Sequence, residues 1–195
     1  VSWLYYADRL MEFPAGVIGV SLSTVLLPSL AKSFSKKKSA DYSELVNWGL
    51  RLGILLAVPA ATALAILAIP LISTLFHYGA FTERDILMTQ YALTAYSIGL
   101  VGLILIKILA PAFYAQQNVK TPVKIAIFTL FCTQFMNLIF IGYLQHAGLA
   151  LAIGIGACIN AGLLFYHLKK GNLFKLNVGW LIFLLKIIFA TFVMA

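Results

Sequence analysis

Long apolar stretches alternate with short polar segments along the whole chain. A bilayer requires about 20 apolar residues for each helix that crosses it. Six stretches reach or approach that length: residues 2–31, 48–76, 86–114, 123–144, 147–168 and 180–195. The pattern therefore predicts an all-α, polytopic membrane protein with about six transmembrane helices. The second and third stretches exceed the length of a straight crossing, so we expect these helices to tilt or kink.

The composition supports this class of protein. Hydrophobic residues make up 62% of the chain and charged residues 10%, whereas a soluble domain carries about 25% charged residues. The mean hydropathy is +0.98. The chain begins with Val1 and ends with Ala195 inside an apolar stretch, so we expect it to be an internal part of a longer protein.

Lysine-rich polar segments alternate with polar segments that have little or no net charge. The first, third and fifth hold nine lysines: Lys32, Lys36, Lys37, Lys38, Lys120, Lys124, Lys169, Lys170 and Lys175. The second segment, residues 77–85, has one arginine against two acidic residues, and the fourth has no fixed charge. Because cytoplasmic loops are enriched in Lys and Arg, we place the lysine-rich loops in the cytoplasm. Membrane topology also explains the net charge of +8 without nucleic acid as a partner.

Three charged residues interrupt the first apolar stretch: Asp8, Arg9 and Glu12. At about 100° per residue, all three fall on one side of a helix. A charge at bilayer depth is costly and normally faces a protein interior or a wet cavity, and a guanidinium group matches phosphate oxygens. The pattern indicates a site for an anion, with Arg9 as the binding group and two modulating carboxylates. A salt bridge between helices, or a charged cluster at the outer interface, is the alternative.

Lys107 is a second cation inside an apolar stretch. Its side chain either lines a cavity or extends its ammonium group to the cytoplasmic interface, as long basic side chains do near helix ends. The sequence shows neither the spacing of a metal site nor a glycine-rich phosphate loop. We therefore expect no metal, no cofactor and no catalytic residues. Cys132 and Cys158 lie in apolar stretches and are expected to be packing residues.

Five short stretches resemble one known family when they are taken together. They are residues 5–14 (Tyr-Tyr-Ala-Asp-Arg-Leu-Met-Glu-Phe-Pro), 26–30 (Leu-Leu-Pro-Ser-Leu), 79–82 (Gly-Ala-Phe-Thr), 110–115 (Ala-Pro-Ala-Phe-Tyr-Ala) and 120–124 (Lys-Thr-Pro-Val-Lys). The chain resembles the MurJ/MviN family of lipid II flippases, in the multidrug/oligosaccharidyl-lipid/polysaccharide exporter superfamily. The first and fourth stretches are the most specific, and the resemblance extends over nearly the whole chain.

The resemblance implies a two-lobed fold of fourteen helices, of which this chain would cover about helices 8 to 13. Residues 1–168 would form most of the second, C-terminal six-helix lobe. Residues 169–195 would form a cytoplasmic loop and a truncated first accessory helix. The first lobe would be missing from this chain.

The resemblance also implies roles for individual residues. The family has a cationic central cavity, and the arginine of its Ala-Asp-Arg-Leu motif corresponds to Arg9. The acidic positions of the motif correspond to Asp8 and Glu12. The lysine in the helix before the Ala-Pro-x-Phe-Tyr motif corresponds to Lys107.

The implied function is that of a flippase, not of an enzyme. It would move lipid II, the undecaprenyl-diphosphate-linked peptidoglycan precursor, across the bacterial cytoplasmic (inner) membrane by alternating access for cell-wall synthesis. Its partners would be the diphosphate headgroup and polyprenyl tail, membrane lipids and the first lobe. One alternative is an exporter of other lipid-linked oligosaccharides, or a drug/cation antiporter, of the same superfamily. Another is a membrane-embedded polyprenyl-phosphate transferase, which would need carboxylate or histidine clusters at loop edges.

Overall fold

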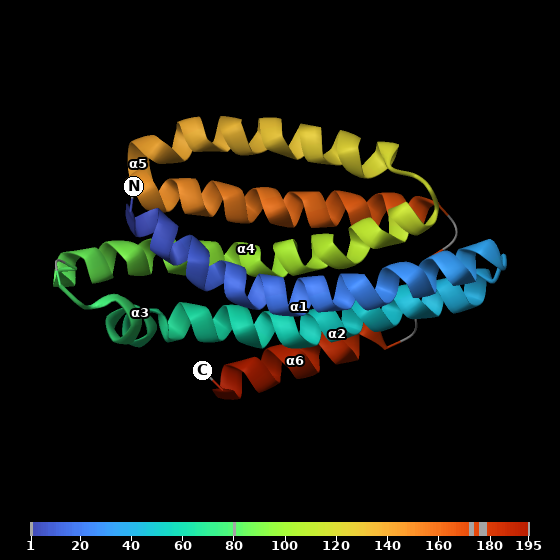
Figure 1. Cartoon of the computed structure of the whole chain (residues 1–195), viewed down its shortest axis with the longest axis horizontal. Coiled ribbons are helices and arrows are strands. Elements are labelled where there is room, and N and C mark those ends of the chain that lie inside the picture. The colour runs from blue at the N-terminus through green and yellow to red at the C-terminus, as the bar shows by residue number, and fades with distance from the viewer. Residues whose placement is uncertain (1, 80, 172–173, 176–178, 195) are drawn as a thin grey trace.

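The computed structural model describes residues 2–79, 81–171, 174–175 and 179–194. Within these ranges the chain forms helices and no strand (Figure 1), which confirms the prediction of an all-α fold. The helices are α1 (Ser2–Ser35), α2 (Ser39–Ile66), α3 (Ala68–Phe76), α4 (Glu83–Ala115), α5 (Lys120–Lys170) and α6 (Trp180–Met194).

Five helical segments of the described structure are long and apolar enough to cross a membrane. They are Trp3–Ser35, Ser39–Ile66, Glu83–Ala115, Lys120–Gly142 and His146–Lys170. These segments confirm the prediction of a polytopic membrane protein. The sixth predicted span corresponds to α6, which has 15 residues and is shorter than the roughly 20 residues of a full crossing. Residue 195, the last of that predicted span, lies outside the described residues.

The second predicted span is divided into two helices. Helix α2 ends at Ile66, and α3 begins at Ala68 after the single residue Leu67. Pro70 explains the position of the break, because it has no N–H group to donate to the carbonyl of Ile66 and its ring would press on that turn. Proline is tolerated in the first turn of a helix, so α3 can start two residues before Pro70.

Helix α5 contains 51 residues and would be about 76 Å long if it were straight. Figure 1 shows instead that α5 reverses direction and forms two arms that lie side by side. The first candidate span within α5 ends at Gly142 and the second begins at His146. The reversal therefore lies at the fourth polar segment of the sequence, residues 145–146, between the fourth and fifth predicted spans. Gly148 makes the tight turn possible, since a Cβ atom there would lie 2.6 Å from the carbonyl oxygen of Phe140.

Helix α4 lies at the centre of the bundle and packs against α1, α2 and α5 (Figure 1). It is the most buried of the candidate spans. Small residues bring the backbones of α4 and α5 together: a Cβ atom at Gly102 would lie 2.7 Å from the backbone of Ala157, and one at Gly99 would overlap Gly154. Close approach of this kind is the usual way in which membrane helices gain packing contacts.

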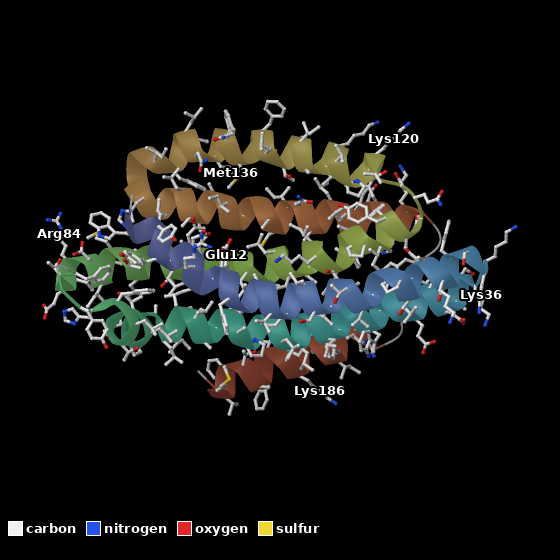
Figure 2. All side chains as sticks on the ribbon, in the orientation of Figure 1. Glu12, Lys36, Arg84, Lys120, Met136 and Lys186 are labelled. Atoms are coloured by element: carbon white, nitrogen blue, oxygen red, sulfur yellow. The ribbon has the colours of Figure 1, made fainter. Side chains whose placement is uncertain are left out.

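The two ends of the bundle differ in charge. Lys36 and Lys120 lie at one end, which we call the lysine-rich end, and Arg84 lies at the opposite end, which we call the Arg84 end (Figure 2). Helix α1 runs from the Arg84 end to the lysine-rich end (Figure 1). Loops that alternate between the two ends are what a chain of successive membrane crossings requires.

Candidate functional site

The first turns of α1 are fixed at the Arg84 end by contacts with three other elements. The indole nitrogen of Trp3 donates a hydrogen bond to the carboxylate of Asp85, at 2.6 Å, and the Trp3 ring packs on His146 with 5.3 Å between ring centroids. The Tyr6 ring lies 4.7 Å from Phe76 of α3. These contacts set the position of the charged residues that follow on α1.

Helix α1 has one packed side and one open side. The packed side includes Ala7, Met11, Ala15, Leu22 and Leu26, all of them buried. Arg9 and Glu12 are exposed and lie on the open side. Figure 2 labels Glu12, which is nearer the Arg84 end than the lysine-rich end. The site is therefore an open helix face within the described structure, and not an enclosed pocket.

Arg9 and Glu12 form an ion pair on this open face. The Nη1 atom of Arg9 lies 2.7 Å from Oε2 of Glu12, and the two side chains are 57% and 55% exposed. The Arg9 guanidinium also lies 5.0 Å from the centre of the Tyr5 ring. Because both partners belong to α1, the pair does not tie α1 to another described helix. Solvent-exposed ion pairs contribute little to stability, so the pair can rearrange easily.

Asp8 is placed differently from the other two charged residues of α1. It is half-buried, whereas Arg9 and Glu12 are exposed. On the helix it falls in line with Ala15 and Leu26, which are buried. The three charges predicted on one side of α1 therefore divide into an exposed pair and a carboxylate at the edge of the packed side.

Lys107 reaches α1 from α4. It is half-buried, its side-chain carbons lie against Gly19, and its Nζ donates a hydrogen bond to the carbonyl oxygen of Ala15 at 3.2 Å. Ala15 lies nearer the Arg84 end than Gly19, because α1 runs away from that end. The ammonium group therefore points away from the lysine-rich end, opposite to the direction in which a side chain would snorkel to that interface.

The two cations occupy two levels of the same helix. Ala15, which accepts the hydrogen bond from Lys107, lies six residues beyond Arg9, which corresponds to about 9 Å along the axis. Gly16 is beside this acceptor, and outside its own turn of helix no atom of the described chain lies within 4 Å of a Cβ atom built there. The arrangement offers positive charge and N–H donors to an anion with several oxygens. Within the described part of the chain, no group of three His, Cys, Asp or Glu side chains could hold a metal ion.

Arg51 is not among the predicted site residues, although it lies inside the second predicted span. Its guanidinium lies 5.7 Å from the Trp180 ring and 5.6 Å from the Phe183 ring of α6. The Trp180 indole nitrogen also donates to Asn47 Oδ1 at 3.0 Å. Arg51 and Asn47 thus attach α6 to α2, and Arg51 is directed to α6. The charge inside an apolar stretch was the signal that could have drawn attention to it.

Comparison with known proteins gives a consistent result. The sequence model of the family described as "Lipid II flippase MurJ" matches residues 1–195. A protein of Burkholderia cenocepacia named "Lipid II flippase MurJ" is 53% identical over the whole chain, and a "Probable lipid II flippase MurJ" of Haemophilus influenzae is 40% identical. The chain spans 38% and 39% of the lengths of these two relatives.

A solved structure gives the same result for the fold. This structure is described as "Lipid II flippase MurJ, inward closed conformation", and it superposes with a TM-score of 0.87 at 27% sequence identity. The match covers all of this chain and 39% of the solved chain. The helical arrangement described above is thus the arrangement of one part of a larger membrane protein.

Proposed function

The chain belongs to the lipid II flippase MurJ family, and on this basis we propose that it is part of a transporter that moves lipid II across the bacterial cytoplasmic (inner) membrane. The protein would act in cell-wall synthesis as a transporter and not as an enzyme. The names of the relatives favour a flippase over an exporter of other lipid-linked sugars, a drug antiporter or a transferase.

The membrane orientation and the division of the chain are part of this proposal. The lysine-rich end faces the cytoplasm, because cytoplasmic loops carry an excess of Lys and Arg. Residues 1–168 form most of the second lobe, and residues 169–195 form a cytoplasmic loop and the first accessory helix. The first lobe completes a central cavity against the open face of α1.

Arg9 and Lys107 bind the diphosphate of lipid II. The observation that carries this assignment is the direction of Lys107, whose ammonium group reaches the Ala15 carbonyl beside the unoccupied space at Gly16. A guanidinium binds two phosphate oxygens at once, whereas an ammonium acts as a compact charge. Glu12 and Asp8 modulate the site, since their negative charges oppose a second anion and favour its release.

The mechanism is alternating access, in which two lobes move about a central site. The headgroup is too polar for the hydrocarbon core and crosses in the cavity, while the polyprenyl tail stays among membrane lipids. The diphosphate would meet Lys107 first and Arg9 second on its way outward, because Arg9 lies closer to the Arg84 end. The membrane potential, negative inside, favours outward movement of an anion by up to about 2.3 kcal/mol per charge for each 100 mV.

The decisive experiment replaces an essential lipid II flippase in a depletion strain with the full-length protein that contains this chain. We expect the wild-type protein to restore growth and precursor export, and Arg9→Ala to abolish both while membrane insertion is kept. Arg84→Ala is the matched control, since it removes an exposed arginine outside the site. Failure of the wild-type protein would contradict the flippase function, and full activity of Arg9→Ala would contradict the assigned site.

A further inference from the structure

The path of the Lys107 side chain depends on Gly19, a residue without a side chain. Lys107 extends from α4, and its carbon chain lies directly against Gly19, on the packed side of α1. Beyond Gly19 the ammonium group reaches the carbonyl oxygen of Ala15. The lysine side chain therefore runs through the contact between the two helices, and its charge lies at the backbone of α1 beside Ala15.

A larger residue at position 19 would block this path. A Cβ atom built on Gly19 lies 2.5 Å from Cδ of Lys107 and 3.2 Å from its Cβ. Rotation of the lysine side chain can move Cδ, but the Lys107 Cβ is fixed by the backbone of α4. Either the lysine must take another rotamer or the two helices must separate. In both cases Nζ loses the carbonyl of Ala15.

We propose that Gly19 is a positioning residue, whose missing side chain lets Lys107 carry its ammonium group through the α1–α4 contact to the Ala15 carbonyl beside Gly16. This inference rests on the proposed function, in which Lys107 binds the diphosphate of lipid II. Gly19 has no contact with the substrate and acts through Lys107 alone.

The Ala15 carbonyl has a defined part in this arrangement. An ammonium group has three N–H donors, of which this carbonyl accepts one. The carbonyl is neutral and belongs to a helix in which it also accepts a backbone hydrogen bond. A negatively charged phosphate oxygen is a stronger acceptor. The Ala15 carbonyl thus aligns the ammonium group in the empty site and releases it when an anion enters the space beside Gly16.

The first arm of the test measures the position of the Lys107 amine without transport. Lysine acylation in membranes that contain the full-length protein, read by mass spectrometry, gives the labelling of Lys107 relative to the exposed Lys124. We expect Gly19→Ala to change this ratio severalfold. Gly162→Ala is the matched control, because it adds a methyl group to a membrane helix at a position with no atom within 4 Å. An unchanged ratio in Gly19→Ala overturns the proposal.

The second arm measures lipid II binding by native mass spectrometry. Loss of one charge-assisted hydrogen bond predicts that Gly19→Ala weakens binding about tenfold. In a Lys107→Ala background Gly19→Ala should add no further loss, because the carbon chain that it would strike is gone. Additive losses would show that Gly19 acts through general packing, and they overturn the proposal. If Gly19→Ala changes the labelling but Lys107→Met binds lipid II normally, the positioning stands and the proposed binding role of Lys107 fails.

Discussion

Arg9 and Lys107 both bring positive charge to α1, and they are held there in different ways. Arg9 pairs with Glu12, three residues along the same helix, and more than half of its side chain is exposed. Lys107 comes from α4, is half-buried, and donates to the backbone of α1 at Ala15. The first arrangement is local, whereas the second depends on how two helices pack.

This difference determines what a substitution at each position can reveal. Removing the Arg9 side chain deletes a charge and a weak surface pair, so the fold of α1 should change little. Removing the Lys107 side chain also deletes carbon atoms that fill the contact with Gly19. A test of charge at Lys107 therefore needs a replacement that keeps the length of the side chain.

The largest effect is expected when the guanidinium fork of Arg9 is lost. Arg9→Lys keeps the charge but not the two parallel N–H donors that match a diphosphate. We expect export by the full-length protein to fall by about ten- to a hundredfold, the equivalent of one hydrogen bond to a charged group. The measurement is the rate of lipid II appearance in the outer leaflet, at equal expression. Lys107→Arg should reduce export less than Arg9→Lys does, because Lys107 acts as a compact charge. Export at the wild-type rate by Arg9→Lys would show that positive charge alone is sufficient at position 9.

Much of the fold follows from local patterns in the sequence. The membrane spans, the reversal within α5 and the break before Pro70 each depend on residues close together in the chain. The burial of α4 could not be predicted in this way, because it arises when distant positions such as Gly99 and Gly154 meet. Membrane spans are apolar on all sides, so their hydrophobicity does not indicate which side packs against protein.

The candidate site shows the same limit. The pairing of Arg9 with Glu12 follows from a spacing of three residues, which places the side chains next to each other on a helix. The contact of Lys107 with Ala15 joins residues 92 positions apart, and no periodicity predicts it. The sequence alone consequently leaves open whether Lys107 snorkels. Arg51 was missed because its partners Trp180 and Phe183 also lie far away in the chain.

A smaller effect is expected when Lys107 loses only its charge. Lys107→Met keeps an unbranched, flexible side chain over Gly19 and removes the ammonium group. We expect lipid II binding, measured by native mass spectrometry, to weaken about tenfold, while thermal stability stays near that of the wild type. Lys124→Met is the control, since Lys124 is exposed at the lysine-rich end. Equal binding by both variants would remove Lys107 from the site and leave Arg9 as its sole assigned cation.

The smallest effect is expected at Glu12, and it separates binding from turnover. Glu12→Gln removes the carboxylate next to Arg9 and with it the repulsion toward an incoming diphosphate. Binding of lipid II should stay the same or become a few times tighter, and export should slow by a few-fold, because a ligand held more firmly in one state shifts the conformational equilibrium toward that state. Glu44→Gln, at an exposed position on α2, should change neither quantity. Weaker binding of lipid II by Glu12→Gln would instead mean that the carboxylate orients Arg9 for the substrate. The Arg9–Glu12 pair would then belong to the binding site in the same way as the contact between Lys107 and Ala15.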